Sequence, residues 1–329
     1  MTSYILCDTD SRHLLFPFAL TRPVADCRAG IFTIREKWEH ALRQTTSTLT
    51  ENYLSEKFPL EENEDNYFIN SALIPNKDLL DSLHQLKKEE SLFSENTWLA
   101  SRCDNLYSFR KSSGFRKYEY KNPFILIQYP WDFIRFNEQL LCEDFSLITK
   151  NRTSFKINSS NHIFNPENIF IEEGAELNGV TINAFKGPVY IGKDAVIMEG
   201  ALIRGPLAVC EKSVLKMGTK IYGTTTIGPH SVVGGEIKNS IISGFSNKAH
   251  DGYLGDAVIG EWCNLGAGTS CSNVKNNAGS VKVWNEREKR FLEAGKKCGV
   301  MMGDYSRTSI HAMINTGTVT GISCNIFCA

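Results

Sequence analysis

Residues 191–233 read IGKDAV IMEGAL IRGPLA VCEKSV LKMGTK IYGTTT IGPHSV V, which is a run of seven six-residue units and the start of an eighth. Each unit begins with Ile, Val or Leu, and its fifth residue is small except at Leu207. A period of six fits neither an α-helix nor a single strand and is typical of a parallel β-helix. We expect the aliphatic residues to point into a shared core and the small residues to form the corners.

The six-residue pattern continues beyond this run with two interruptions. It slips at Gly234 and returns at Tyr253, Ile259 and Leu265, and after residues 272–300 it returns at Met302. The interrupting segment is charged at its centre and apolar on both sides, which predicts a hairpin or loop inserted into the coil. An insertion that rejoins a repeat in phase often covers a site or a partner.

Glycine content divides the chain into two parts. Residues 1–150 contain two glycines, whereas residues 151–329 contain 23. In the first part, short apolar runs such as Tyr4–Cys7 and Tyr67–Ile74 alternate with amphipathic segments such as Ile31–Leu42. This order predicts an α/β domain over residues 1–150, followed by the β-helix over 151–329. We also expect helices over Asn76–Glu89 and from Pro130 to Leu141, where proline is favoured at a helix start.

Composition excludes several classes of partner. Lys and Arg number 36 against 37 Asp and Glu, so no basic surface for nucleic acid is indicated. No run of 18 apolar residues is present, and the first 20 residues lack the pattern of a signal peptide. The ten cysteines show no CxxC pair or metal-ligand spacing. These features favour a cytoplasmic protein with reduced thiols and no membrane partner.

Polar residues that can carry chemistry gather within residues 236–273. Lys238 supplies a cation, His250 a base with an unperturbed pKa near 6.5, and Tyr253 a phenol. Asn264 and Asn273 add two amides. These polar residues interrupt the apolar pattern of the coil, which makes them candidates for a functional site.

The motifs around these residues match a known family. They are Lys248-Ala-His250, Tyr253-Leu-Gly-Asp256, Ile259-Gly, Asn264-Leu-Gly-Ala267-Gly-Thr269, Asn273, Gly299-Val-Met-Met-Gly-Asp304 and Asn315-Thr-Gly-Thr-Val319. This pattern resembles the bifunctional N-acetylglucosamine-1-phosphate uridyltransferase/glucosamine-1-phosphate acetyltransferases, especially a variant bacterial form and the related archaeal sugar-1-phosphate nucleotidylyltransferases. The resemblance covers about 160 residues of the second part and implies a left-handed β-helix of the hexapeptide transferase type.

The resemblance also implies roles for individual residues. His250 matches the general base, while Lys238, Tyr253 and Asn264 match residues that hold the sugar phosphate. A second phosphate-binding cation of the family falls near Lys220, and Ala267 and Asn273 match contacts to acetyl-coenzyme A. The family often has an aromatic residue after Asn273, where this chain has Val274.

Each residue also has a simpler interpretation. His250 fits an exposed turn, Lys238 a solvated lysine, and Asn264 a ladder of asparagines along a coil. Tyr253 falls in the interior phase of the repeat, so a packing role is an alternative. His230, His250 and His311 lie 20 and 61 residues apart without a close pair, so the sequence predicts no metal site in this part.

The first domain resembles a reduced nucleotidyltransferase. The uridyltransferase signature has a glycine-rich loop after the first strand, but Cys7-Asp-Thr-Asp-Ser-Arg12 contains no glycine. Thr21-Arg22-Pro23 and Lys37 resemble the end of that signature, which makes Arg22 and Lys37 candidate nucleotide-binding residues. Tyr129-Pro-Trp-Asp132 is similar to the archaeal family's connector into the β-helix. An active domain of this type would bind UTP with Mg²⁺, and we expect weak or absent turnover.

The sequence therefore predicts an acetyltransferase that uses acetyl-coenzyme A and an amino-sugar phosphate, first of all glucosamine 1-phosphate, in nucleotide-sugar (UDP-N-acetylglucosamine) biosynthesis. Uridylyl transfer is a second candidate activity of the same chain, for which we expect weak or absent turnover. The alternatives are a non-catalytic trimeric scaffold that binds sugar nucleotides, or a nucleotidyltransferase alone. The family resemblance implies a homotrimer.

Overall fold

The computed structural model describes residues 2–327, which form two compact units. The first contains residues 2–15, 19–27 and 32–128, and the second contains 16–18, 28–31 and 129–327. Helix α5 (Asp132–Thr149) thus belongs with the second unit, although the boundary expected from glycine content lies at residue 150. The reason is packing, because Leu141 of α5 shares a buried cluster with Ala208 of the β-helix.

The first unit is an α/β domain, as predicted, built on a mixed sheet of six strands in the order β2-β1-β3-β5-β4-β6. The pairs β1–β2, β1–β3 and β4–β6 are parallel, whereas β5 runs antiparallel to β3 and β4. Its elements are β1 (Thr2–Cys7), η1 (Asp10–Leu15), η2 (Val24–Asp26), α1 (Ile34–Leu42), β2 (Ser47–Leu49), α2 (Asn52–Ser55), β3 (Asp65–Asn70), α3 (Lys77–Gln85), β4 (Glu90–Ser94), β5 (Thr97–Cys103), α4 (Leu106–Phe109), η3 (Ser112–Gly114) and β6 (Arg116–Glu119).

Capping residues explain where its helices begin. The helix expected from residue 31 starts at Ile34, because the Thr33 side chain accepts the backbone N–H of Glu36 and the Glu36 carboxylate accepts that of Thr33. Asn76 caps α3 with a single bond, because its side-chain oxygen accepts the backbone N–H of Leu79. Trp38, on the inner face of α1, is fully buried and donates its indole N–H to the carbonyl of Leu73.

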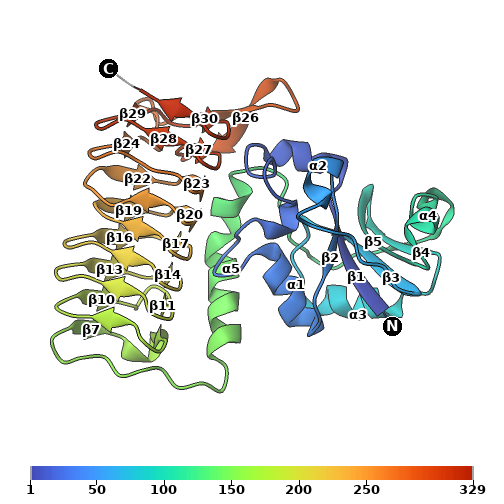
Figure 1. The fold of residues 1–329 in the computed structure, drawn as a ribbon, viewed down its shortest axis with the longest axis horizontal. Coiled ribbons are helices and arrows are strands. Elements are labelled where there is room, and N and C mark those ends of the chain that lie inside the picture. The colour runs from blue at the N-terminus through green and yellow to red at the C-terminus, as the bar shows by residue number, and fades with distance from the viewer. Residues whose placement is uncertain (1, 328–329) are drawn as a thin grey trace. The chain divides into compact units, whose positions relative to one another are not determined.

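The second unit is a parallel β-helix with three faces, and α5 runs along one of them (Figure 1). The first face contains β7 (His162–Phe164), β10 (Thr181–Asn183), β13 (Leu202–Arg204), β16 (Lys220–Tyr222), β19 (Glu236–Lys238), β22 (Tyr253–Gly255), β24 (Ser270–Cys271) and β29 (Met313–Ile314). The second face, which carries α5, contains β8 (Ile169–Ile171), β11 (Val189–Ile191), β14 (Leu207–Val209), β17 (Thr225–Ile227), β20 (Ile241–Gly244), β23 (Val258–Glu261), β27 (Met301–Met302) and β30 (Val319–Thr320).

The third face contains β9 (Glu176–Leu177), β12 (Val196–Ile197), β15 (Val214–Leu215), β18 (Val232–Val233) and β21 (Asn247–Lys248). It continues through bridges from Asn247 to Asn264 and from Asn264 to Arg307 into β28 (Arg307–Thr308) and β31 (Asn325–Ile326). A short η4 (Pro166–Asn168) precedes β8.

The core of the β-helix is the stack of aliphatic residues predicted from the repeat. Ile203 pairs with Ile221, Ile221 with Ile237, and Ile237 with Leu254, and all four side chains are buried. Burying such a side chain contributes about 1.5–3 kcal/mol. The expected interior position of Tyr253 was wrong by one residue, because Leu254 fills the core and Tyr253 faces outward at the surface.

One corner of the coil, between the second and third faces, carries a column of stacked rings. His230 lies 5.0 Å from Phe245 between ring centroids, and Phe245 lies 4.8 Å from Trp262, with nearly parallel planes. All three residues have left-handed backbone angles, with φ of 56°, 51° and 58°. Such angles are uncommon for bulky residues.

The insertion within residues 272–300 forms the expected hairpin. Strands β25 (Val281–Asn285) and β26 (Arg290–Gly295) pair antiparallel, and the charged residues 286–289 form the turn. The backbone N–H of Cys298 donates to the carbonyl of Asn273, so the two ends of the insertion meet beside the coil.

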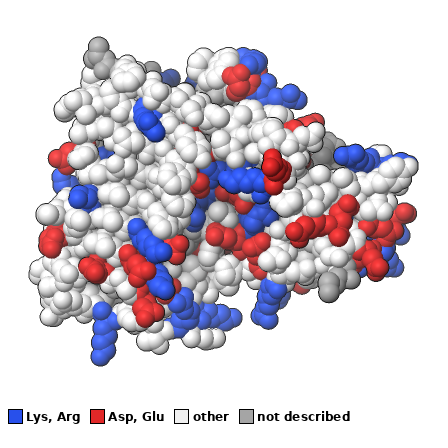
Figure 2. Space-filling model, viewed as in Figure 1, with Lys and Arg blue, Asp and Glu red and all other residues white. Residues whose placement is uncertain are grey.

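On the face drawn in Figure 2, basic and acidic side chains are interspersed, in keeping with the balanced composition. Within residues 2–327, none of the helices has the length and apolar character that crossing a membrane requires.

Candidate functional site

Polar residues of β16, β19 and β22 lie side by side on the first face. The register places Lys220 beside Glu236 and Glu236 beside Tyr253, while Tyr222 neighbours Lys238. Tyr222 donates its hydroxyl to Glu236, and this bond raises the pKa of the phenol. The Lys238 ammonium lies 5.5 Å from the centroid of the Tyr222 ring. Lys220, Lys238 and Tyr253, which the sequence singled out, therefore share one surface.

Tyr253 is half-buried at one end of this surface. Burial, followed by the nearby Tyr222, Asp256 and Glu236, raises the pKa of its phenol to about 12. The phenol is therefore protonated at neutral pH and available as a hydrogen-bond donor. It lies over Gly255, where an added Cβ would come within 2.3 Å of the Tyr253 oxygen. Gly255 thus leaves the space that the ring occupies.

The corner next to Tyr253 holds a buried carboxylate. Asp256 accepts a hydrogen bond of 2.6 Å from Asn239 through one oxygen and a bond from Asn273 through the other. Asp256 and Asn239 both have φ of 47°, a conformation that Asp and Asn tolerate better than most residues. Asn273, the expected coenzyme contact, is thus mostly buried, with one N–H engaged by Asp256.

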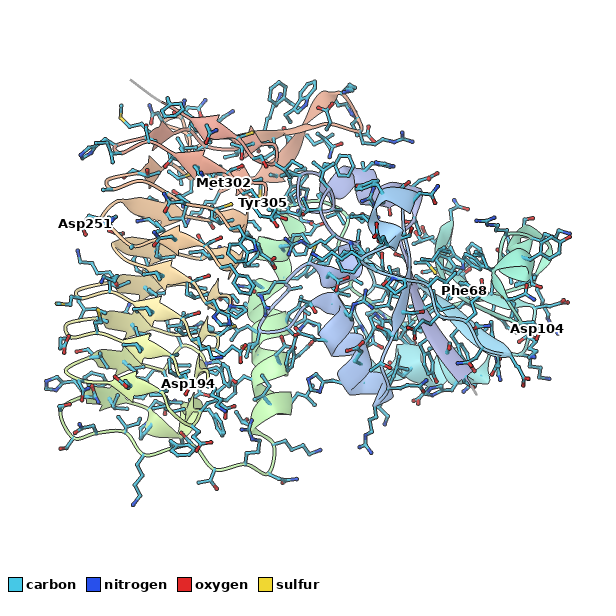
Figure 3. The ribbon with its side chains drawn as sticks, viewed as in Figure 1. Phe68, Asp104, Asp194, Asp251, Met302 and Tyr305 are labelled. Carbon is cyan, nitrogen blue, oxygen red and sulfur yellow. The ribbon has the colours of Figure 1, made fainter. Side chains whose placement is uncertain are left out.

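His250 lies at the corner that joins the third face to the first. It is exposed, between β21 and β22, three residues before Tyr253. Asp251, the next residue, lies at the edge of the β-helix turned away from α5 (Figure 3). The imidazole is therefore accessible from solvent beside the edge of the first face.

A buried lysine supports this corner. The side chain of Lys248 points into the core at the level of Val233, and its ammonium donates to the carbonyls of Gly234 at 3.1 Å and His250 at 2.8 Å. Burial lowers the pKa of this group to about 8, against a smaller opposing effect of Asp251. Lys248 belongs to the matched motif, but nothing in the hexapeptide pattern marked it as an interior residue.

Asn264 and Ala267 lie apart from the polar surface of the first face. Asn264 is on the third face, where its side-chain oxygen accepts a bond of 2.9 Å from Asn247, which is the ladder arrangement considered above. Ala267 is in the following turn, and its carbonyl accepts the backbone N–H of His311. Within residues 2–327 there is no group of three or more His, Cys, Asp or Glu side chains that could hold a metal ion.

In the first unit, the carboxyl edge of the parallel strands is filled by its own side chains. Asp8, directly after β1, accepts bonds from Thr50 at 2.6 Å and Ser71 at 2.8 Å, and Arg12 lies 3.3 Å away. Ligands of open α/β sheets bind at this edge. Of the candidate nucleotide-binding residues, Arg22 is half-buried between η1 and η2, and Lys37 is buried in α1.

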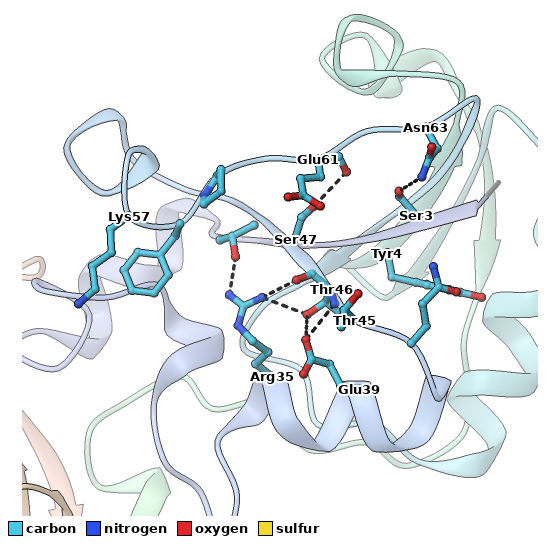
Figure 4. Close-up of a pocket in the computed structure, with 14 residues that line it drawn as sticks. Ser3, Tyr4, Arg35, Glu39, Thr45, Thr46, Ser47, Lys57, Glu61 and Asn63 are labelled. Atoms are coloured by element: carbon cyan, nitrogen blue, oxygen red, sulfur yellow. Dashed lines mark hydrogen bonds between the residues drawn. The ribbon is translucent and has the colours of Figure 1, made fainter.

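A hollow of about 530 Å³ in the first unit lies elsewhere, beside the edge strand β2 (Figure 4). Arg35 binds Asp26 with two bonds of 2.8 Å and also donates to Thr46 and Thr48. Glu39 accepts bonds from the backbone and hydroxyl of Thr46. These two charged groups are bonded to the protein itself, so the hollow gives no sign of a ligand.

Comparison with known proteins agrees with this architecture. Residues 4–153 match the family model described as sugar nucleotidyl transferase. The bifunctional protein GlmU of Methanocaldococcus jannaschii is 28% identical over 275 residues, which is 83% of this chain and 59% of that protein. A bifunctional sugar-1-phosphate nucleotidylyltransferase/acetyltransferase of Sulfurisphaera tokodaii is 31% identical over 144 residues, 43% of this chain and 36% of that protein. The chain thus spans less than two thirds of the length of either relative. These matches confirm the family resemblance inferred from the motifs.

Proposed function

We propose that this chain, whose residues 4–153 match the sugar nucleotidyl transferase family model, transfers an acetyl group from acetyl-coenzyme A to the amine of an amino-sugar phosphate. Glucosamine 1-phosphate is the first substrate to test. The observation that carries the proposal is the place of His250, exposed at the edge of the face that holds Lys238, Lys220 and Tyr253. A base and a phosphate-binding surface are the two things that this reaction needs from the protein.

The chemistry divides among these residues. A sugar amine is protonated near neutral pH and attacks a thioester only after it loses a proton, which His250 accepts. The nitrogen then bonds to the acetyl carbon, the carbon–sulfur bond breaks, and the coenzyme A thiolate takes up a proton. Lys238 and Lys220 offer cations for the phosphate, and the protonated phenol of Tyr253 donates a hydrogen bond to the sugar. Asn264, Ala267 and Asn273 remain proposed contacts to the substrates.

Replacement of His250 tests the proposal. His250→Ala should fold normally, because the side chain is exposed, and should lower acetyl transfer by roughly 10²–10⁴-fold, the usual contribution of a general base. His84→Ala, at an exposed histidine of α3 in the first unit, is the control and should retain activity. Turnover close to wild type in His250→Ala would remove this residue from the mechanism. It would favour the alternative of a scaffold that binds sugar nucleotides without a reaction.

Nucleotidyl transfer is a second candidate activity, favoured by the family match of residues 4–153. It would require UTP and Mg²⁺, with Arg22 and Lys37 near the triphosphate. The carboxylate of Asp8 and the guanidinium of Arg12 occupy the edge of the sheet where a glycine-rich loop would hold phosphate. We therefore propose weak or absent uridylyl transfer.

We further propose a homotrimer in a reducing compartment such as the cytoplasm. Large apolar side chains such as Phe185 and Met217 are 69% exposed on the β-helix, which suits a subunit contact. The nine cysteines that the structure describes are all free thiols. Reduced thiols are the rule in the cytoplasm.

A further inference from the structure

The first face of the β-helix carries its Lys and Arg side chains on three successive strands. They are Lys238 on β19, Lys220 on β16 and Arg204 on β13, and the other strands of this face, all of them within the described residues, contribute none. Neighbouring strands lie about 4.8 Å apart, so Arg204 is about 14 Å from the level of Tyr253 on β22. The row begins beside Tyr253 and leads away from it along the face.

The cations of this row are available to an anion. Arg204 and Lys220 are exposed, and within residues 2–327 neither side chain forms an ion pair or a hydrogen bond with the protein. The neighbouring carboxylate, Glu236, accepts the hydroxyl of Tyr222. Lys238 contacts the face of the Tyr222 ring rather than a carboxylate. Arg and Lys in this state are suited to phosphate, with Arg able to form two bonds at once.

A hollow of about 550 Å³ covers part of this row. Glu236 of β19 lines its end nearest to Tyr253, Tyr222 and Lys220 of β16 and Arg204 of β13 line its middle, and residues of β10 and β7 line its far end. Lys238 and Tyr253 lie outside its lining. The far end differs chemically from the middle, because Phe164 offers a ring that is 47% exposed and Asn183 offers an amide. A ring and an amide are the groups that stack on a nucleobase and bond to its edge.

The order of groups along the hollow fits a molecule longer than a sugar phosphate. The single phosphate of a hexose 1-phosphate held at Tyr253 would lie at the level of Lys238 and Lys220, and nothing in it would use Arg204 or Phe164. We propose that the amino sugar acetylated at this site is linked to a nucleoside diphosphate. This inference rests on the acetyl transfer proposed above and changes its acceptor.

In this arrangement the amine points to His250 and the two phosphates lie along Lys238, Lys220 and Arg204. The nucleobase lies on Phe164 with its edge toward Asn183. The bond changes are those of acetyl transfer alone: the carbon–nitrogen bond forms, the thioester carbon–sulfur bond breaks, and the proton lost by the amine reaches the coenzyme A thiolate through His250. The diphosphate is not cleaved, so it acts only in binding.

Kinetics with two acceptors test the inference. Acetylated product is measured by mass spectrometry for the intact protein with acetyl-coenzyme A and either glucosamine 1-phosphate or UDP-glucosamine. We expect kcat/KM to be at least tenfold higher with UDP-glucosamine. Arg204→Ala should lower that value about tenfold or more through KM, the loss expected for one charged hydrogen-bonding partner, and leave glucosamine 1-phosphate within twofold. Lys212→Ala, an exposed cation at the corner between the second and third faces, is the control and should change neither.

The outcomes separate the two proposals. A higher kcat/KM for glucosamine 1-phosphate, with Arg204→Ala equal to wild type for both acceptors, would overturn the inference and keep acetyl transfer. If neither acceptor is acetylated, the proposed acetyl transfer is wrong. Calorimetry with UDP-glucosamine then tests the binding site alone. The site is supported if Arg204→Ala weakens binding tenfold and Lys212→Ala does not. If Arg204→Ala alters the oligomeric state and affects both acceptors equally, the row is a subunit contact and the inference is wrong.

Discussion

Replacing the buried lysine at the His250 corner gives a quantitative test of the structure. Lys248 lies in the aliphatic column of the third face, with Val233 on one side and Leu265 on the other. Lys248→Met keeps an unbranched chain of similar volume in that column and removes the ammonium. The carbonyls of Gly234 and His250, which accept hydrogen bonds from the wild-type ammonium, have no donor in this variant at any pH. The pH dependence of the change therefore reports the buried charge alone.

The magnitude follows from the lowered pKa of this amine. Folding shifts it from 10.5 to about 8, so the folded state binds fewer protons than the unfolded state between these values. Stability rises with pH wherever the unfolded state binds more protons, so the charge destabilises the fold below pH 8 and this cost disappears as the pH approaches 10.5. At 1.36 kcal/mol per pKa unit, wild type should gain about 2.5 kcal/mol relative to Lys248→Met between pH 7 and pH 10.

Urea unfolding of the β-helix at these two pH values measures this difference, at one protein concentration because subunit contacts contribute to stability. Leu265→Met is the matched control, since it changes the same column without a titrating group, and its effect should be the same at both pH values. The reasoning would be refuted if the difference in the free energy of unfolding between wild type and Lys248→Met were the same at both pH values within about 0.5 kcal/mol. In that case the two carbonyls hold the ammonium well enough to cancel the effect of burial.

Two further predictions concern assembly and the first domain. Light scattering should give the mass of a homotrimer, as the exposed apolar side chains of the β-helix suggest, and a stable monomer with full acetyl transfer would contradict this. Wild type should release little pyrophosphate from UTP and N-acetylglucosamine 1-phosphate with Mg²⁺, because Asp8 and Arg12 fill the edge of the sheet. Any uridylyl transfer that is present should be lost in Arg22→Ala, while acetyl transfer persists. Robust pyrophosphate release by wild type would contradict the expectation and show that a loop without glycine can hold the triphosphate.

The fold was largely predictable because the repeat has one physical cause. Every sixth residue from Ile191 to Val233 reaches the core, so a periodic sequence reports a periodic structure. The prediction failed at Tyr253 because the coils there are shorter. Ile221 pairs with Ile237 and Ile237 with Leu254, after sixteen and seventeen residues rather than the eighteen of three hexads. A deletion at a corner shifts the phase without leaving a signal in the strands themselves.

The candidate site was only partly predictable. The motifs mark His250, Lys238 and Tyr253 as candidates. They do not tell which face of the β-helix each residue occupies, because a corner placed one residue earlier moves a side chain to another face. The role of Lys248 was hidden because a lysine is not expected in an aliphatic column. Arg204 belongs to none of the matched motifs. Its place in the row of cations depends on the register of three strands, which the sequence does not give.

The stacked rings of His230, Phe245 and Trp262 couple the coils that carry them. Holding a bulky residue in the left-handed region costs about 1–2 kcal/mol, and each ring contact contributes about 0.5–1.5 kcal/mol. A residue in the middle of the column has a neighbour on each side, so its strain is offset only while both adjacent coils are folded. A solenoid of independent coils would fray from its ends, whereas this corner makes neighbouring coils open together. The middle of the β-helix is therefore expected to exchange its amide hydrogens as one cooperative unit.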